Sequence, residues 1–103
     1  MITERLTFQA AYGKGDELVA LMKESFRVMP MDSVMASRLY TDLTGKMFTC
    51  AVEIDYADLA TYAASTAGDA NSYGSTEFQE WFAKMVACTE LGERQLFNSE
   101  ALS

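Results

Sequence analysis

A set of polar side chains on two predicted strands could act together on a small organic molecule. The set comprises Arg5, Gln9, Arg38, Tyr40, Thr49 and Glu53. Arg38 and Tyr40 stand two residues apart on one strand and point the same way, and Glu53 faces them from the neighbouring strand. A guanidinium could hold an enolate, phenolate or carboxylate, while Glu53 or Tyr40 could move a proton if burial shifted its pKa. We interpret Glu53 and Tyr40 as candidate catalytic residues, and the other four as candidate ligand-binding residues.

The same charges have a purely structural interpretation. Arg5, Arg38 and Glu53 could pair with one another and fix the strand register, since ion-pair networks also occur on sheets. The chain contains no histidine, so the commonest general base, zinc ligand and haem ligand is missing. Any catalysis must then use carboxylate, Tyr, Cys, Lys or Arg. We expect neither a metal nor any other cofactor.

Two alternating runs that flank Thr44 and Gly45 position these side chains. A two-residue loop at that point would form an antiparallel hairpin in which Leu39 lies opposite Cys50. One face of the hairpin is then almost wholly apolar, with Met35, Leu39, Thr41, Phe48, Cys50, Val52 and Ile54. The other face is half polar, with Ala36, Arg38, Tyr40, Thr49, Ala51 and Glu53. A slip of one residue would bury Arg38, so burial penalties favour this assignment of faces.

The segments before the hairpin predict a strand followed by a helix. Residues 2–12 alternate between apolar and polar side chains, and Glu4 is the one break in the apolar face. Acids at Asp16 and Glu17, followed by apolar residues at helical spacing, indicate a helix. We expect this helix to end before Pro30, because proline disfavours helical geometry in the residue ahead of it.

A second helix is predicted directly after the hairpin. Asp55 and Asp58 stand where they could cap a helix that carries Leu59 and Tyr62. Residues 66–75 are rich in small residues and turn formers, so we interpret them as an irregular connector and as the only candidate lid.

The last third of the chain completes the pattern. Thr76 and Gln79 form a capping box for a helix whose apolar face includes Trp81, which we expect in the core. Gly92 is a natural stop, and residues 93–100 are predicted to be a strand. The order strand, helix, strand, strand, helix, strand is the pattern of the ferredoxin-like fold. We therefore predict an α+β fold with a four-stranded antiparallel sheet and two helices on one face.

Length and charge limit the partners. The chain has 103 residues and a net charge of −7, with 15 acids against 8 scattered bases. That length supplies one core, so we expect a single domain over residues 1–103. Nucleic acid and anionic membranes are poor partners for so acidic a chain. No long apolar run is present, so we expect a cytoplasmic protein with Cys50 and Cys88 as free thiols.

Two segments of the second half resemble a known family. Residues 77–85, Glu-Phe-Gln-Glu-Trp-Phe-Ala-Lys-Met, and residues 90–94, Glu-Leu-Gly-Glu-Arg, look like the corresponding part of NIPSNAP-like members of the dimeric α+β barrel superfamily. Residues 58–62 resemble the helix start in those proteins. The resemblance implies a homodimer whose two sheets enclose a barrel cavity for a small organic molecule. Several relatives are monooxygenases, isomerases or cyclases that often need no metal or flavin, and some degrade haem. Many use a histidine that this chain lacks, so no catalytic residue carries over.

Two classes of function follow. The first is a small-molecule binder or cofactor-independent enzyme, of monooxygenase, isomerase or cyclase type, acting in the barrel cavity of a homodimer. The second is a non-catalytic dimeric interaction or regulatory module whose polar sheet face simply forms the subunit contact. In both cases we expect a homodimer packed through the sheet face opposite the helices. An open cavity with the polar groups converging on it favours the first class, and a filled interface favours the second.

Overall fold

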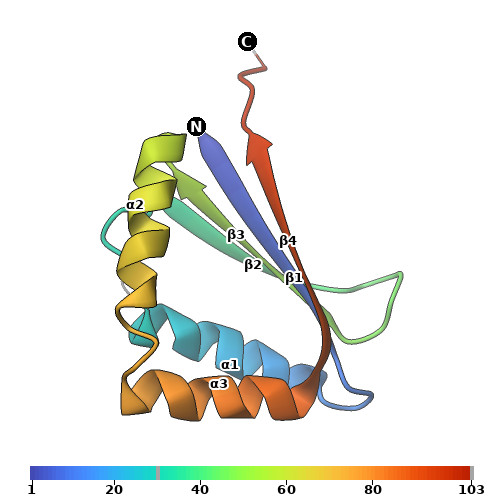
Figure 1. Ribbon diagram of the computed structural model, residues 1–103. Coiled ribbons are helices and arrows are strands. Elements are labelled where there is room, and N and C mark those ends of the chain that lie inside the picture. Colours follow the sequence, from blue (N-terminus) through green and yellow to red (C-terminus); the bar gives the residue numbers. More distant parts are fainter. Residues whose placement is uncertain (30, 103) are drawn as a thin grey trace.

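The computed structural model describes residues 1–29 and 31–102. The elements are β1 (Ile2–Ala10), α1 (Gly15–Val28), β2 (Ala36–Thr41), β3 (Thr49–Tyr56), α2 (Leu59–Ala70), α3 (Thr76–Cys88) and β4 (Thr89–Asn98). The strands form one four-stranded antiparallel sheet in the order β2-β3-β1-β4, and the helices lie on one face of it (Figure 1). The predicted ferredoxin-like α+β fold is confirmed, and the helical part between β3 and β4 is divided into α2 and α3. Among the described residues, no helix has both the length and the apolar character needed to cross a membrane.

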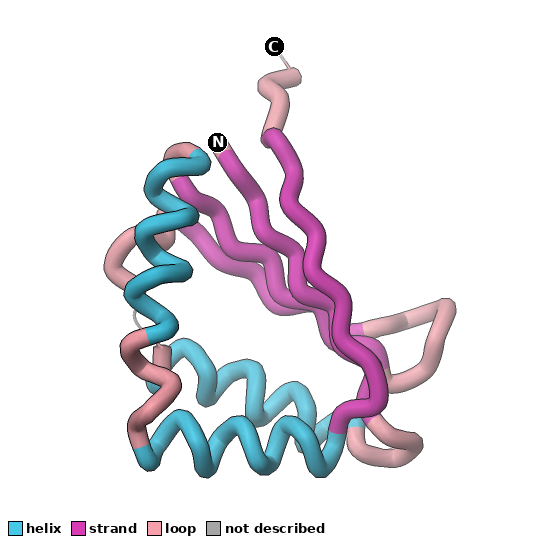
Figure 2. Tube along the Cα trace, in the orientation of Figure 1, coloured by secondary structure: helices cyan, strands magenta, loops and turns pink. Residues whose placement is uncertain are grey.

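The helices do not lie flat on the sheet. In Figure 1, α1 and α3 run side by side along the bottom of the view, and α2 rises from them toward the N-terminal end of β1. The sheet runs diagonally from the start of α2 to the end of α3, so α2, the α1–α3 pair and the sheet form a triangle in this view. Figure 2 shows both termini at the same end of the sheet, where Ile2 of β1 pairs with Asn98 of β4. The helices therefore meet the sheet at its two ends, through α1 and α3 at one and the start of α2 at the other, and stand away from it in between (Figure 1).

The hairpin register differs from the prediction. Leu39 lies opposite Val52 instead of Cys50, so the predicted two-residue loop at Thr44 and Gly45 is wrong. The connection is longer because the Asp42 carboxylate accepts the backbone N–H of Thr49 at 2.9 Å and closes the loop below its tip. Since the register shift is an even number of residues, the side chains of the paired segments 36–41 and 50–55 keep their predicted faces.

The start of α2 is set by one of the two proposed caps. Asp58 accepts the backbone N–H of Thr61 at 2.7 Å and is the N-cap. Asp55 does not cap the helix; it lies within β3 and its carboxylate binds Arg38. The predicted connector over residues 66–75 is also wrong in its first half, because α2 continues to Ala70. Small residues such as alanine allow a helix here although they supply few apolar contacts.

Other boundaries shift by a few residues. The helix α1 ends at Val28, and Pro30 lies outside the described residues. The cap of α3 is Ser75, whose hydroxyl accepts the N–H of Phe78 at 3.1 Å, so the capping box predicted at Thr76 is wrong. Gly92 does not stop the helix but lies inside β4.

The core fills the end of the molecule where α1 and α3 meet the sheet. Its buried members are Ala10, Leu18, Leu21, Met22, Cys50, Val52, Met85 and Cys88. Trp81 packs against this core as predicted but is only partly buried, and its indole N–H donates to the carbonyl oxygen of Leu21 at 2.7 Å. Cys50 and Cys88 are free thiols, as expected.

Candidate functional site

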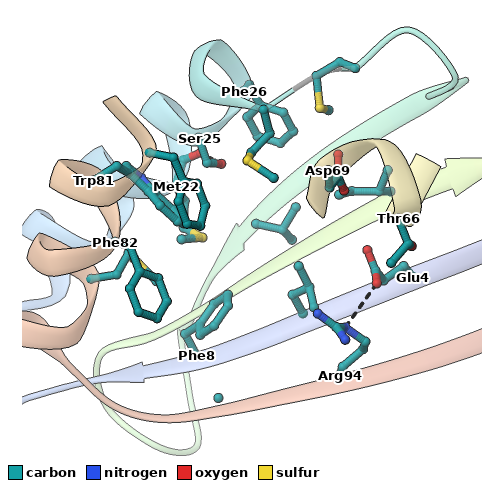
Figure 3. Close-up of a pocket in the computed structure, with 18 of the residues that line it drawn as sticks. Glu4, Phe8, Met22, Ser25, Phe26, Thr66, Asp69, Trp81, Phe82 and Arg94 are labelled. Carbon is teal, nitrogen blue, oxygen red and sulfur yellow. Dashed lines mark hydrogen bonds and ion pairs between the residues drawn. The ribbon is translucent and has the colours of Figure 1, made fainter. Parts of the chain in front are cut away.

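A cavity of about 740 Å³ lies between the sheet and the helices (Figure 3). Its volume falls in the range of about 300 to 1,000 Å³ that is typical of small-molecule sites. Most of its wall is aromatic or methionine side chain, including Phe8, Met22, Phe26, Trp81, Phe82 and Met85. Methionine is flexible and polarizable, so such a wall can adapt to the shape of a bound molecule.

The cavity exists because α2 carries no large apolar side chain into the core. None of the residues of this helix, all of which the structure describes, is buried. Alanine, serine, threonine and glycine make up most of the segment, and these side chains are too short to fill the space against the sheet. The small residues that led us to interpret residues 66–75 as an irregular connector continue α2 to Ala70, and they leave an open chamber beside this helix.

One end of the cavity is polar. Glu4 on β1 is only 7% exposed, and its Oε2 atom accepts a hydrogen bond from the hydroxyl of Tyr62 at 2.9 Å. The same oxygen pairs with Nε of Arg94 on β4 at 3.3 Å. These two partners explain why an acid can stand on the apolar face of β1. A buried carboxylate that is hydrogen-bonded and paired costs much less free energy than an unpaired one.

A second carboxylate, Asp69 of α2, lines the same end of the cavity. Figure 3 shows Asp69 and Thr66 on α2 and, on the sheet, Glu4 with its dashed contact to Arg94. Burial raises the pKa of Asp69 above its ordinary value, and the negative charge of Glu4 raises that pKa further. Burial and the hydrogen bond to Glu4 likewise raise the pKa of Tyr62. The polar end thus combines acid, phenol and guanidinium groups beside an apolar chamber.

The residues predicted from sequence lie on the opposite, open face of the sheet. Glu53 is at their centre: its Oε2 pairs with Nη2 of Arg5 at 2.6 Å, and its Oε1 pairs with Nε of Arg38 at 3.1 Å. The hydroxyl of Tyr40 donates to the same Oε1 at 3.1 Å. Nη2 of Arg38 also pairs with Oδ1 of Asp55 at 2.9 Å. The structure therefore brings four of the predicted residues together in one ion-pair network.

The network sets the protonation of its own carboxylates. Hydrogen bonds from Arg5 lower the pKa of Glu53, and those from Arg38 lower the pKa of Asp55, although burial opposes both shifts. The same contacts raise the pKa of Arg38 above its ordinary value, led by its hydrogen bond to Asp55. A carboxylate with a lowered pKa is a weaker base, so this geometry favours the structural interpretation of these charges.

Gln9 and Thr49 stand apart from that network. They are directly paired across β1 and β3 and line a smaller hollow of about 390 Å³, together with Tyr40 and Leu91. The hydroxyl of Thr49 donates to the backbone carbonyl of Lys46 at 2.8 Å. The proposed binding and catalytic roles of the open-face residues stay predictions.

Sequence reasoning missed the groups at the polar end of the cavity, but two signals pointed to them. Glu4 is an acid at a position where its strand alternation calls for an apolar residue. Tyr62, Thr66, Asp69 and Tyr73 recur at steps of three or four residues, which is the spacing of one helix face. That spacing continues through the segment we interpreted as a connector.

Comparison with known proteins finds likeness in structure and none in sequence. No protein-family model matches the chain, and no curated protein matches its sequence. An uncharacterized NIPSNAP domain protein from Burkholderia xenovorans is similar to it, with a TM-score of 0.80 and 17% identity over 100% of this chain and 98% of that one. A NIPSNAP family protein from Agrobacterium tumefaciens has a TM-score of 0.77 and 15% identity, over 99% of this chain and 95% of that one.

An oxygenase shares the same architecture. A variant of SnoaB, a cofactor-independent oxygenase from Streptomyces nogalater, has a TM-score of 0.70 and 13% identity, over 98% of this chain and 95% of that one. Identities this low establish the fold alone. The chain therefore has the fold of NIPSNAP domain proteins and of cofactor-independent oxygenases, which confirms the predicted NIPSNAP-like resemblance at the level of architecture.

Proposed function

We propose that this protein binds a small organic molecule in the cavity between the sheet and the helices and acts on it without a cofactor. The observation that carries the proposal is a chamber of about 740 Å³ with an apolar, aromatic wall and one polar end. Apolar walls supply affinity by removing ligand surface from water, and a few polar groups fix its orientation.

The lining defines the chemical class of the ligand. Aromatic rings such as Phe78, Phe82 and Trp81 suit a flat, mostly apolar body, because ring faces and edges pack well against one another. The polar end suits a single carbonyl or acidic hydroxyl, placed between Glu4 and Asp69 where Arg94 can reach it. An aromatic or partly unsaturated ketone or phenol meets both requirements.

The reaction class rests on what the similar structures are. One is a cofactor-independent oxygenase, and another is an antibiotic biosynthesis monooxygenase with a TM-score of 0.66 and 13% identity. Where no cofactor takes part, the residues of the site themselves must bind, orient and deprotonate the organic substrate. An oxygenase, isomerase or cyclase of this type agrees with a site built from carboxylates, tyrosines and an arginine.

A cavity-filling variant tests the location of the site. Thr66 lines the cavity from α2, whereas Ala67 is exposed on the same helix and does not line it. Thr66→Phe should weaken binding of a naphthol or tetralone probe by about tenfold or more, because the added ring occupies ligand space. Ala67→Phe adds the same ring outside the cavity and should leave the affinity unchanged. Quenching of Trp81, the single tryptophan, reports binding. Equal affinities of the two variants would contradict the location.

A second candidate is the non-catalytic dimeric module, and the open face of the sheet supports it. Tyr40 is 47% exposed, Leu91 57% and Phe97 39%, and all belong to this face. The guanidinium of Arg5 lies 5.0 Å from the centre of the Phe97 ring. Arg5, Arg38, Glu53 and Asp55 are already paired on this face, so covering these four with a second copy costs less than covering isolated charges would. We propose a homodimer through this face in either functional class.

Such a dimer would also enclose the residues first predicted as a site. If a ligand binds between the two sheets, Arg38→Ala should weaken its binding by about 1.5 to 3 kcal/mol, the range for a charge-assisted hydrogen bond. Retained affinity in an Arg38→Ala dimer would remove Arg38 from the ligand site and leave it as a structural residue.

A further inference from the structure

We propose that Asp69 is the proton-transfer residue of the cavity. In this proposal its carboxylate takes a proton from an acidic C–H or O–H group of the bound ligand. Arg94 then stabilises the negative charge that develops on the ligand oxygen. The inference deepens the proposed function and rests on a ligand occupying the helix-side cavity.

Two carboxylates face the polar end, and their surroundings differ. Glu4 accepts the hydroxyl hydrogen of Tyr62 and pairs with Arg94, so its Oε2 atom already has two partners within the protein. The carboxylate of Asp69 has no hydrogen bond or ion pair with any side chain that the structure describes. It is partly buried beside the charge of Glu4, and both factors raise its affinity for a proton. Of these two carboxylates, Asp69 is therefore the one that no described side chain engages, and it is available to take a proton from a ligand.

Arg94 has donors left over. Its contact with Glu4 uses Nε at 3.3 Å, and 64% of its side chain is exposed. Within the described part of the chain, Arg94 pairs with no other carboxylate and its two terminal nitrogens donate no hydrogen bond, so they remain available to a ligand. A guanidinium presents several N–H donors in a rigid plane and suits an enolate or phenolate oxygen. Because Arg94 and Glu4 both come from the sheet, the oxyanion donor lies on the opposite wall from Asp69 (Figure 3).

The step is a simple proton transfer. A ligand C–H or O–H bond breaks, an O–H bond forms on Asp69, and the electron pair stays on the ligand as an enolate or phenolate. Nothing is oxidised or reduced, and return of the proton restores both partners. The titratable groups that line the cavity together with Asp69 are Glu4, Tyr56, Tyr62, Tyr73, Glu93 and Arg94.

The probe is 2-tetralone, a bicyclic ketone with an acidic C–H bond beside its carbonyl. In D₂O, proton NMR follows the replacement of that hydrogen by deuterium, and quenching of Trp81 fluorescence measures binding separately. The wild-type protein should accelerate exchange over buffer. Asp69→Asn should lose about 10² of that acceleration, the usual contribution of a general base, while its affinity for tetralone stays the same. Asp69→Glu should recover part of the rate, and Asp16→Asn, an exposed acid on α1, should match the wild type.

The pH profile separates a base from a structural residue. The accelerated rate should rise with pH through the raised pKa of Asp69, because only the carboxylate can accept the proton. Asp69→Asn should remove that rise. A merely structural role of Asp69 would change stability or affinity and leave the shape of the profile intact.

Each failure has its own pattern. Tetralone that binds but exchanges no faster than in buffer overturns the role of Asp69 and leaves the cavity as a binding site. Full acceleration in Asp69→Asn together with its loss in Glu4→Gln assigns the proton to Glu4 and also overturns the inference. Tetralone that fails to bind at all, in both the wild type and Thr66→Phe, overturns the proposed function and this inference together.

Discussion

The hydroxyl of Tyr62 on α2 donates a 2.9 Å hydrogen bond to Oε2 of Glu4 on β1, 58 positions earlier in the chain. The ring of Tyr62 also packs edge-on against Tyr56 of β3, with 5.3 Å between ring centres. Since α2 has no buried residue, these contacts are central to holding the helix beside the sheet. One side chain thus fixes both the wall of the cavity and the carboxylate at its polar end.

Tyr62→Phe should show what that hydrogen bond contributes. The substitution keeps the ring contact and removes the donor to a buried carboxylate, so we expect a loss of about 1 to 3 kcal/mol in the free energy of unfolding. Urea denaturation followed by circular dichroism measures it. Tyr73→Phe is the matched control, because Tyr73 is 47% exposed and its hydroxyl has no hydrogen bond to the described residues. An equal loss in both variants would contradict the role given to Tyr62.

Trp81→Ala should cost about 3 kcal/mol, the low end for loss of a large aromatic from a core. The low end applies because Trp81 is only partly buried, although its N–H also donates to Leu21. Denaturation followed by circular dichroism gives the value, since the only tryptophan is removed. Phe82→Ala, next to it but 52% exposed, should cost less. In the wild type, an emission spectrum typical of a fully water-exposed indole would disprove the placement.

Stability should fall in acid because of the open-face network. The pKa values of Glu53 and Asp55 are lowered in the folded protein. Their contribution to the free energy of unfolding is therefore complete above the pKa values of the unfolded chain, about 4. It is lost as pH falls through the lower pKa values of the folded protein. Glu53→Gln should reduce stability at neutral pH and flatten its dependence on pH below about 4. Glu100→Gln, at an exposed site near the C-terminus, should leave the acid unfolding curve unchanged; a flattened curve there would argue against the network.

The proposed homodimer should be sensitive to charge on the open face. Ala51→Asp places a carboxylate at the centre of that face, beside Tyr40 on the neighbouring strand, and should weaken association by burying an unpaired charge. Ala20→Asp makes the same change at an exposed position of α1 and should leave the dimer intact. Sedimentation velocity at micromolar concentration measures both. A wild-type protein that sediments as a monomer would rule out the dimer.

The sequence was sufficient for the architecture because its local signals agree with one another. Alternation sorted the hairpin side chains to their correct faces even though the loop was misjudged, since a two-residue shift preserves the period. The loop error came from Asp42, whose side chain replaces a ladder hydrogen bond at Thr49. Such a contact between residues seven positions apart leaves no periodic trace.

The cavity was harder to predict from the sequence, because it is a space that the side chains between α2 and the sheet leave unfilled. The small side chains of α2 explain why this helix leaves space beside the sheet, but they do not by themselves predict where the helix lies. Arg94 and Glu4 meet only through the pairing of β1 with β4, so their proximity is a property of the topology. By contrast, Arg38 and Glu53 share a hairpin, and their pairing could be predicted from local spacing.

The strand order β2-β3-β1-β4 sets the first strand of the chain beside the last. During synthesis, β1 can pair with β3 long before β4 exists, so one of its hydrogen-bonding edges stays open until the chain is nearly finished. Pairings between distant segments are also the slowest to form in folding. A chain interrupted before Thr89 would expose the whole 9-residue edge of its central strand, the kind of edge on which other chains aggregate.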